Sequence, residues 1–116
     1  MTRTIWAIVD DMFFASKIRG TAEALSIGIS FPRTMEVIRE KLRNEKPDLV
    51  IIDLHNQRVD PLNVVKELKA HQQTITVMGF FSHVETELQR NALAAGFDTV
   101  IPRSVFARDL AEILKG

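Results

Sequence analysis

The stretch Pro47-Asp48-Leu49-Val50-Ile51-Ile52-Asp53 decides the fold of this chain. Four consecutive apolar residues, three of them β-branched, stand between its two aspartates. A short apolar run bounded by polar residues predicts a strand that is buried on both faces of a parallel sheet. Asp53 then lies at the carboxyl end of this strand, where open α/β sheets place their ligand crevices. A simple turn-forming role for Asp53 is the alternative at this point.

Apolar runs and amphipathic stretches alternate along the rest of the chain. The runs predict strands at residues 4–9, 27–31, 49–52, 74–81 and 99–101. Apolar residues at helical spacing predict helices at residues 12–25, 34–44 and 61–70, and two more helices follow Ser82 and Ser104. Five β-α units in succession predict an α/β fold with one doubly wound parallel sheet and right-handed crossovers. With five strands we expect the flavodoxin-like order 2-1-3-4-5.

Capping residues refine the helix boundaries. Asp60 before Pro61 is a strong N-cap signal. Ser82 and Glu85 have the spacing of a capping box, so we expect the fourth helix to begin directly after Ser82. Ser104 is expected to cap the terminal helix.

Three glycines carry further expectations. Gly96 suits the C′ position of a helix that ends at Ala95. Gly20 costs a helix interior about 1 kcal/mol relative to alanine, which predicts close packing there. Gly79 inside the fourth strand predicts a bulge or a close approach to the backbone.

The composition is that of one soluble domain, which we expect to span residues 1–116. Lys plus Arg and Asp plus Glu number 15 each, so no overall basic charge attracts nucleic acid or a membrane surface. No apolar stretch has the length of a membrane span, and the N-terminus lacks a signal-peptide pattern. The chain has no cysteine, which excludes disulfides, thiolate metal sites and thiol catalysis. We expect a cytoplasmic protein that binds neither nucleic acid nor membranes directly.

Aspartates follow two strands that are neighbours in the expected sheet. Asp10 and Asp11 come after the first strand, and Asp53 ends the third. Clustered carboxylates repel one another and need a cation or a shifted protonation state. Mg²⁺ suits such a cluster because it is a hard ion that binds carboxylate and phosphate oxygens. A carboxylate beside the ion can itself accept a phosphoryl group. Solvated loop acids balanced by nearby Lys and Arg are the alternative interpretation.

Several motifs then match one protein family. Val9-Asp10-Asp11 resembles the acidic pair that follows the first strand in this family, and Asp53 matches the aspartate of the family that accepts the phosphoryl group. The run 53–62 aligns without a gap to a family loop that usually reads D-x-x-M-P-x-M-D-G-L, and Ala95-Gly96 resembles the A-G after the fourth helix. The chain thus resembles a response-regulator receiver domain, the CheY-like fold of two-component signalling, over its whole length. The resemblance implies that Asp10, Asp11 and Asp53 hold Mg²⁺ together with the backbone carbonyl of His55.

The sequence departs from the family pattern at the positions that read out phosphorylation. Phe81 occupies the position of the family Ser/Thr, and Ser82 is one residue late. Arg103 replaces the family Lys, with a planar fork in place of a compact ammonium. Ser104 replaces the proline that usually follows it, while Pro102 stands on the other side. Val100 replaces the switch aromatic, and in the loop Gln57 and Pro61 replace the family Pro and Gly.

These losses favour an atypical receiver-like module, not an enzyme, that works by binding another protein. Phe81 cannot hydrogen-bond an aspartyl phosphate. Arg103 keeps a cation for the phosphate or carboxylate oxygens, and Ser82 could contact them only with a backbone slip. Two alternatives stay open. One is a competent Mg²⁺-dependent receiver phosphorylated on Asp53 by a histidine kinase. The other is a small flavodoxin-like cofactor carrier or enzyme.

Phenylalanines are expected at the rim of the acidic edge. Helical phase puts Phe13 and Phe14 at the start of the first helix, and Phe81 enters from the opposite side. An apolar lid or protein-contact patch is one interpretation of these three side chains. The other is that two of the three belong to the ordinary core.

The resemblance also implies a partner surface on the fourth helix, fifth strand and fifth helix. By analogy, its exposed members are Glu87, Arg90, Asn91, Arg108 and Ala111. The implied partners are a histidine kinase or a downstream effector, and a homodimer is left open.

Other site patterns are weak in this sequence. Asp53-Leu54-His55 partly matches the D-x-H-x-x-G motif of cobalamin-binding domains, but Arg58 stands in the Gly position. His55, His71 and His83 lie on separate connections and lack metal-ligand spacing. No Gly-rich phosphate loop or G-x-S-x-G motif is present.

Overall fold

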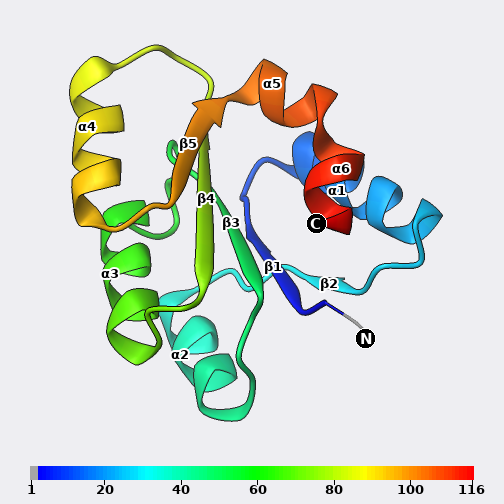
Figure 1. Cartoon of the computed structure of the whole chain (residues 1–116), viewed down its shortest axis with the longest axis horizontal. Coiled ribbons are helices and arrows are strands. Elements are labelled where there is room, and N and C mark those ends of the chain that lie inside the picture. The colour runs from blue at the N-terminus through cyan, green and yellow to red at the C-terminus, as the bar shows by residue number, and fades with distance from the viewer. Residues whose placement is uncertain (1–2) are drawn as a thin grey trace.

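Five parallel strands form one sheet in the order β2-β1-β3-β4-β5, as expected (Figure 1). The computed structural model describes residues 3–116. The strands are β1 (Ile5–Ile8), β2 (Ile29–Ser30), β3 (Leu49–Asp53), β4 (Thr76–Phe81) and β5 (Thr99–Pro102). All five residues of β3 are buried, because β1 and β4 flank it and helices cover both faces. The apolar run 49–52 is therefore a central strand, and Asp53 is its last residue.

Helices lie on both sides of the sheet (Figure 1). One layer contains α2 (Met35–Asn44), α3 (Pro61–His71) and α4 (Thr86–Ala95). The other contains α1 (Met12–Ala24), α5 (Arg103–Arg108) and α6 (Leu110–Lys115). Each layer has its own core, because side chains alternate across every strand. Phe81 of β4 joins the core beneath α2, α3 and α4, whereas Phe80 joins the core beneath α1, α5 and α6.

The local expectations at Asp60 and Gly96 are confirmed, and the one at Gly79 is confirmed in part. Asp60 caps α3 by accepting the amide of Leu62 at 3.0 Å. Gly96 follows α4 with a φ of 127°, a conformation that favours glycine. Gly79 sits in an uninterrupted ladder, so there is no bulge at this position. A Cβ there would lie 2.9 Å from the ring of Phe97, which confirms the close approach.

Other local expectations were wrong. The fourth helix begins at Thr86, and its N-cap Glu85 makes no side-chain capping bond, so Ser82 and Glu85 form no capping box. Ser104 lies inside the first turn of α5, whose N-cap is Pro102. Apart from the backbone of its own helix, no atom would lie within 4 Å of a Cβ on Gly20, so the expected close packing is absent.

Two elements are shorter than expected. The edge strand β2 has two residues, because it pairs only with Ile5 and Trp6 of β1. The terminal helix is divided into α5 and α6 at Asp109, whose φ of −99° and ψ of 12° leave the helical region.

Candidate functional site

Asp53 is the buried acid at the carboxyl edge of the sheet. Among residues 3–116 it is the only buried charged side chain, with 7% of its surface exposed. Its Oδ1 accepts the backbone N–H of His55 at 2.8 Å. Burial raises the pKa of Asp53 above its ordinary value, and the charge of Asp10 adds to this. The His55 amide, the His55 side chain and Arg103 act in the opposite direction on the same pKa.

The two acids after β1 reach the same edge. The register pairs Ile8 of β1 with Ile52 of β3, so the residues that follow the two strands emerge together. Asp10 Oδ2 accepts the backbone N–H of Gln57 at 3.3 Å, from the loop after β3. The structure therefore brings Asp10, Asp11 and Asp53 to one end of neighbouring strands, as the sequence predicted.

Asp11 has both carboxylate oxygens engaged. It is the N-cap of α1, where Oδ1 accepts the amide of Phe14 at 3.1 Å. Its Oδ2 accepts the guanidinium Nη2 of Arg103 at 3.0 Å. The hydrogen bond from the Phe14 amide is the largest influence on the pKa of Asp11 and lowers it; burial opposes this, and the hydrogen bond and charge of Arg103 add to the lowering, so the pKa lies below its ordinary value. Asp11 is therefore an ionised partner of Arg103.

Arg103 is the first residue of α5 and is placed by β5. Its guanidinium carbon lies 4.2 Å from the centre of the Phe14 ring, in addition to the contact with Asp11. Phe14 is itself fixed by Phe80 and Phe106, with ring centres at 5.0 and 5.7 Å. A charged guanidinium stacked on an aromatic face and paired with a carboxylate is a well-held cation.

The three phenylalanines expected at the rim divide into one exposed and two buried side chains. Phe13 is 91% exposed. Phe14 and Phe81 are both 6% exposed, so their placement at the rim was wrong, and the alternative that two of the three belong to the core is confirmed. Successive helical residues point about 100° apart, which turns Phe14 into the core when Phe13 faces solvent. Phe81 points into the core beneath α3 and α4 because strand neighbours alternate.

The remaining predicted site residues are Ser82, Val100 and the members of the expected partner surface. Ser82 is exposed and is the first residue after β4. Val100 is half-buried against the core beneath α4 and pairs with Gly79. Of the expected partner surface, Glu87, Arg90, Asn91 and Arg108 are exposed, and Arg108 also pairs with the neighbouring Asp109. Ala111 is half-buried, so it was wrongly expected to be exposed.

Asn56 is a residue of the site that the sequence reasoning missed. Its Oδ1 accepts the amides of Arg58 and Val59 at 2.8 and 3.1 Å. Its Nδ2 donates to the carbonyl of Ile8 at 3.3 Å. Asn56 thus ties the loop after Asp53 to the end of β1. An asparagine whose side-chain oxygen accepts the backbone N–H two residues later forms an Asx turn, and asparagine in a loop is the sequence signal of such a turn. This signal could have identified Asn56.

The acids fit Mg²⁺ by their chemistry but not by their arrangement in this structure. Carboxylates are ligands that Mg²⁺ prefers. Within residues 3–116, however, no three acidic or histidine side chains are grouped so that they could hold a metal ion. Asp11 is directed to Phe14 and Arg103 instead. The positive charge beside the acids is therefore that of Arg103.

Comparison with known proteins identifies the family. The family model of the response regulator receiver domain matches residues 6–115. Response regulator protein VraR of Staphylococcus saprophyticus is 30% identical over 76 residues, which are 66% of this chain and 36% of the relative. The chain therefore spans about a third of the length of that curated relative.

Solved structures agree on the fold. A CheY-like receiver domain protein from Methanospirillum hungatei superposes with a TM-score of 0.84 at 19% identity, covering 99% of this chain and 92% of that one. CheY4 of Vibrio cholerae gives 0.82 at 12% identity, covering 99% and 98%. In the part of the chain that the structure describes, no helix could cross a membrane. Because the family model matches nearly the whole chain, this chain belongs to the response regulator receiver domain family.

Proposed function

We propose that the chain is an atypical receiver module that signals by binding another protein, without the usual phosphorylation switch, and that it is not an enzyme. The pairing of Arg103 with Asp11 beside the buried Asp53 carries this proposal. In this proposal the negative charge of the acids is balanced by a side chain of the same protein, Arg103. The position of the family Ser/Thr holds the buried Phe81, and Val100 has no ring that could rotate inward.

Arg103 in this proposal takes the place of a divalent cation. Mg²⁺ would be held by Asp10, Asp11, Asp53 and the carbonyl of His55 only if Asp11 first released Arg103. A metal ion would supply positive charge for phosphate oxygens, and the guanidinium already supplies it. Unlike a bound ion, however, the guanidinium is tethered to α5 and stacked on Phe14.

The exposed start of α1 is the proposed contact surface for a partner. Phe13 and Met12 are 91% and 75% exposed, directly after the acids. Exposed neighbouring apolar side chains of this size favour a protein interface. A histidine kinase or a downstream effector would meet the acidic edge and this apolar surface together. The balanced net charge supports neither nucleic acid nor a membrane as the partner.

A competent Mg²⁺-dependent receiver, in which phosphorylation of Asp53 by a histidine kinase operates the switch, is the second candidate. Its carboxylate lies at the strand end, where burial raises its pKa and the charge of Arg103 only partly offsets this. A carboxylate oxygen would attack phosphorus, the P–N bond to a partner histidine would break, and that nitrogen would take up a proton. A response regulator protein from Burkholderia pseudomallei (TM-score 0.76, 16% identity, 96% of this chain and 70% of that one) was solved with a phosphorylated aspartate, a calcium ion and citrate.

One experiment separates the two candidates. The chain and its Asp53→Asn variant are incubated with phosphoramidate and Mg²⁺, and intact mass and amide NMR spectra are recorded on the same samples. We expect either no adduct or an Asp53 adduct that leaves the amides of α4 and β5 in place. An adduct on the wild type alone that shifts these amides would contradict the proposal and establish a competent receiver.

A further inference from the structure

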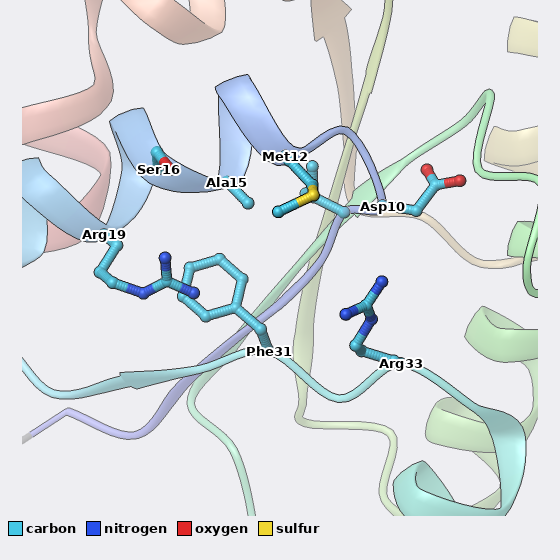
Figure 2. A pocket seen from close by; sticks show the side chains of 8 residues that line it. Asp10, Met12, Ala15, Ser16, Arg19, Phe31 and Arg33 are labelled. Atoms are coloured by element: carbon cyan, nitrogen blue, oxygen red, sulfur yellow. The ribbon is translucent and has the colours of Figure 1, made fainter.

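A hollow lies beside the acidic edge, between the start of α1 and the segment after β2 (Figure 2). Its cavity volume is about 100 Å³. It is lined by Val9, Asp10, Met12, Ala15, Ser16, Arg19, Phe31 and Arg33. Pockets for drug-sized ligands generally have about 300 Å³ or more, so this pocket suits only a small ligand.

Two guanidinium groups line this pocket. The Arg19 guanidinium carbon lies 4.6 Å from the centre of the Phe31 ring, which holds it at one end. Arg33 extends toward Asp10 at the other end (Figure 2). Within residues 3–116 neither arginine forms an ion pair, whereas Arg39, Arg103 and Arg108 do. Both cations are thus available to a ligand.

The rest of the lining is apolar or neutral, apart from one acid. Met12, Ala15 and Phe31 supply apolar walls, and Ser16 adds a hydroxyl. Two arginines and Asp10 leave one net positive charge, which matches a single negative charge on the ligand. A guanidinium recognises a carboxylate through paired hydrogen bonds. The apolar walls favour a ligand that carries carbon next to this group.

We propose that this pocket binds a small organic monocarboxylate, with its charge between Arg19 and Arg33 and its apolar part against Met12 and Phe31. The ligand can be a free acid or the side chain of a glutamate on a partner peptide, which share this chemistry. The inference does not depend on phosphorylation of Asp53.

The test is a titration of the full chain with benzoate at constant ionic strength, followed by amide NMR at Ser16 and Arg33. Benzamide serves as the neutral probe and inorganic phosphate as the probe without an apolar part. A short glutamate-containing peptide and its glutamine counterpart form the second arm. The variants are Arg19→Gln and Arg33→Gln. Lys17→Gln is the control, because Lys17 is an exposed cation of α1 outside the pocket.

Saturable binding of benzoate is expected, weakened about tenfold by either arginine variant and unchanged by Lys17→Gln. Benzamide and phosphate should bind at least about tenfold more weakly. Preferential binding of the glutamate peptide would assign the ligand to a partner protein, and benzoate binding alone would assign it to a free acid. The proposal would be overturned if neither benzoate nor the glutamate peptide bound, or if benzamide or phosphate bound as tightly as benzoate. It would also be overturned if Lys17→Gln weakened binding as much as the arginine variants do.

Discussion

The guanidinium of Arg103 donates to the carboxylate of Asp11 at 3.0 Å, across the edge where β1 and β5 end. The same guanidinium lies over Phe14, which follows Asp11 in the first turn of α1. One side chain thus joins the start of α5 to the acids, to the N-terminus of α1 and to the aromatic core.

The cap that Asp11 provides to α1 is open to a direct test. Asp11→Ala removes the acceptor for Phe14 and the partner of Arg103, and should lower the free energy of unfolding by about 1–2 kcal/mol. Asp11→Asn keeps a good N-cap and should recover most of this loss. Urea denaturation of both variants measures the difference. Equal destabilisation by the two substitutions would show that the cap contributes little.

The contribution of the ionised Asp11 carboxylate to folding stability depends on pH with a defined sign. The pKa of Asp11 is lower in the folded chain than in the unfolded chain, so its ionic contribution is present above the ordinary value of 3.8. This contribution is lost as the pH falls through the folded pKa. The stability difference between wild type and Asp11→Asn should therefore shrink in acid. A difference that stays constant from neutral pH down to about pH 2 would be inconsistent with this assignment.

Ionisation of Asp53 should have the opposite effect on folding stability from ionisation of Asp11. Burial raises its pKa in the folded chain, so the ionised form costs stability once the pH exceeds the unfolded value of 3.8. Asp53→Asn should therefore stabilise the fold at pH 7, and the gain over wild type should decline as the pH falls toward 4. Chemical denaturation at several pH values checks this. A variant less stable than wild type at neutral pH would refute it.

Adjacent phenylalanines of α1 should differ sharply. Phe14→Ala removes a buried ring that contacts Phe80, Phe106 and Arg103, and should cost about 3–5 kcal/mol of unfolding free energy. Phe13→Ala is the matched control and should change stability by less than about 0.5 kcal/mol. Thermal unfolding measures both. Loss of partner binding in Phe13→Ala, with stability intact, is the result that the proposed contact surface requires.

Two glycines form a second matched pair. Gly79→Ala would place a Cβ 2.9 Å from Phe97 and 3.2 Å from Leu54, and should destabilise the chain by about 1–3 kcal/mol. Gly20→Ala meets nothing within 4 Å apart from the backbone of its own helix, and should stabilise the chain by about 0.5–1 kcal/mol. Urea midpoints of the two variants should move in opposite directions. A shift in the same direction would contradict the packing described for Gly79.

The sequence was sufficient to predict the fold because each strand is a distinct apolar run. Alternation of strands with amphipathic helices left one common sheet order, and this order placed Asp10, Asp11 and Asp53 together. Family spacing drew attention to Arg103. Its place over Phe14 could not be predicted, because it depends on how α5 packs against α1.

The errors have a common physical origin. Capping residues such as Ser82 and Ser104 indicate where a helix can begin, but the length of the preceding strand and loop decides where it does. Likewise, helical phase gives the direction of Phe13 relative to Phe14, but not which of them faces the core. These choices are made by tertiary packing, which overrides weak local preferences.

A divalent-ion titration tests most directly whether Arg103 is the cation of the acidic edge. Wild type, Arg103→Met and the control Arg108→Met are titrated with Mg²⁺ by calorimetry, and with Mn²⁺ by paramagnetic broadening of amides near Asp10 and Asp53. Methionine keeps an apolar contact with Phe14 but frees Asp11 and removes a positive charge. We predict that Arg103→Met binds Mg²⁺ at least about tenfold more tightly than the other two proteins. Equal or tighter binding by wild type would contradict the account.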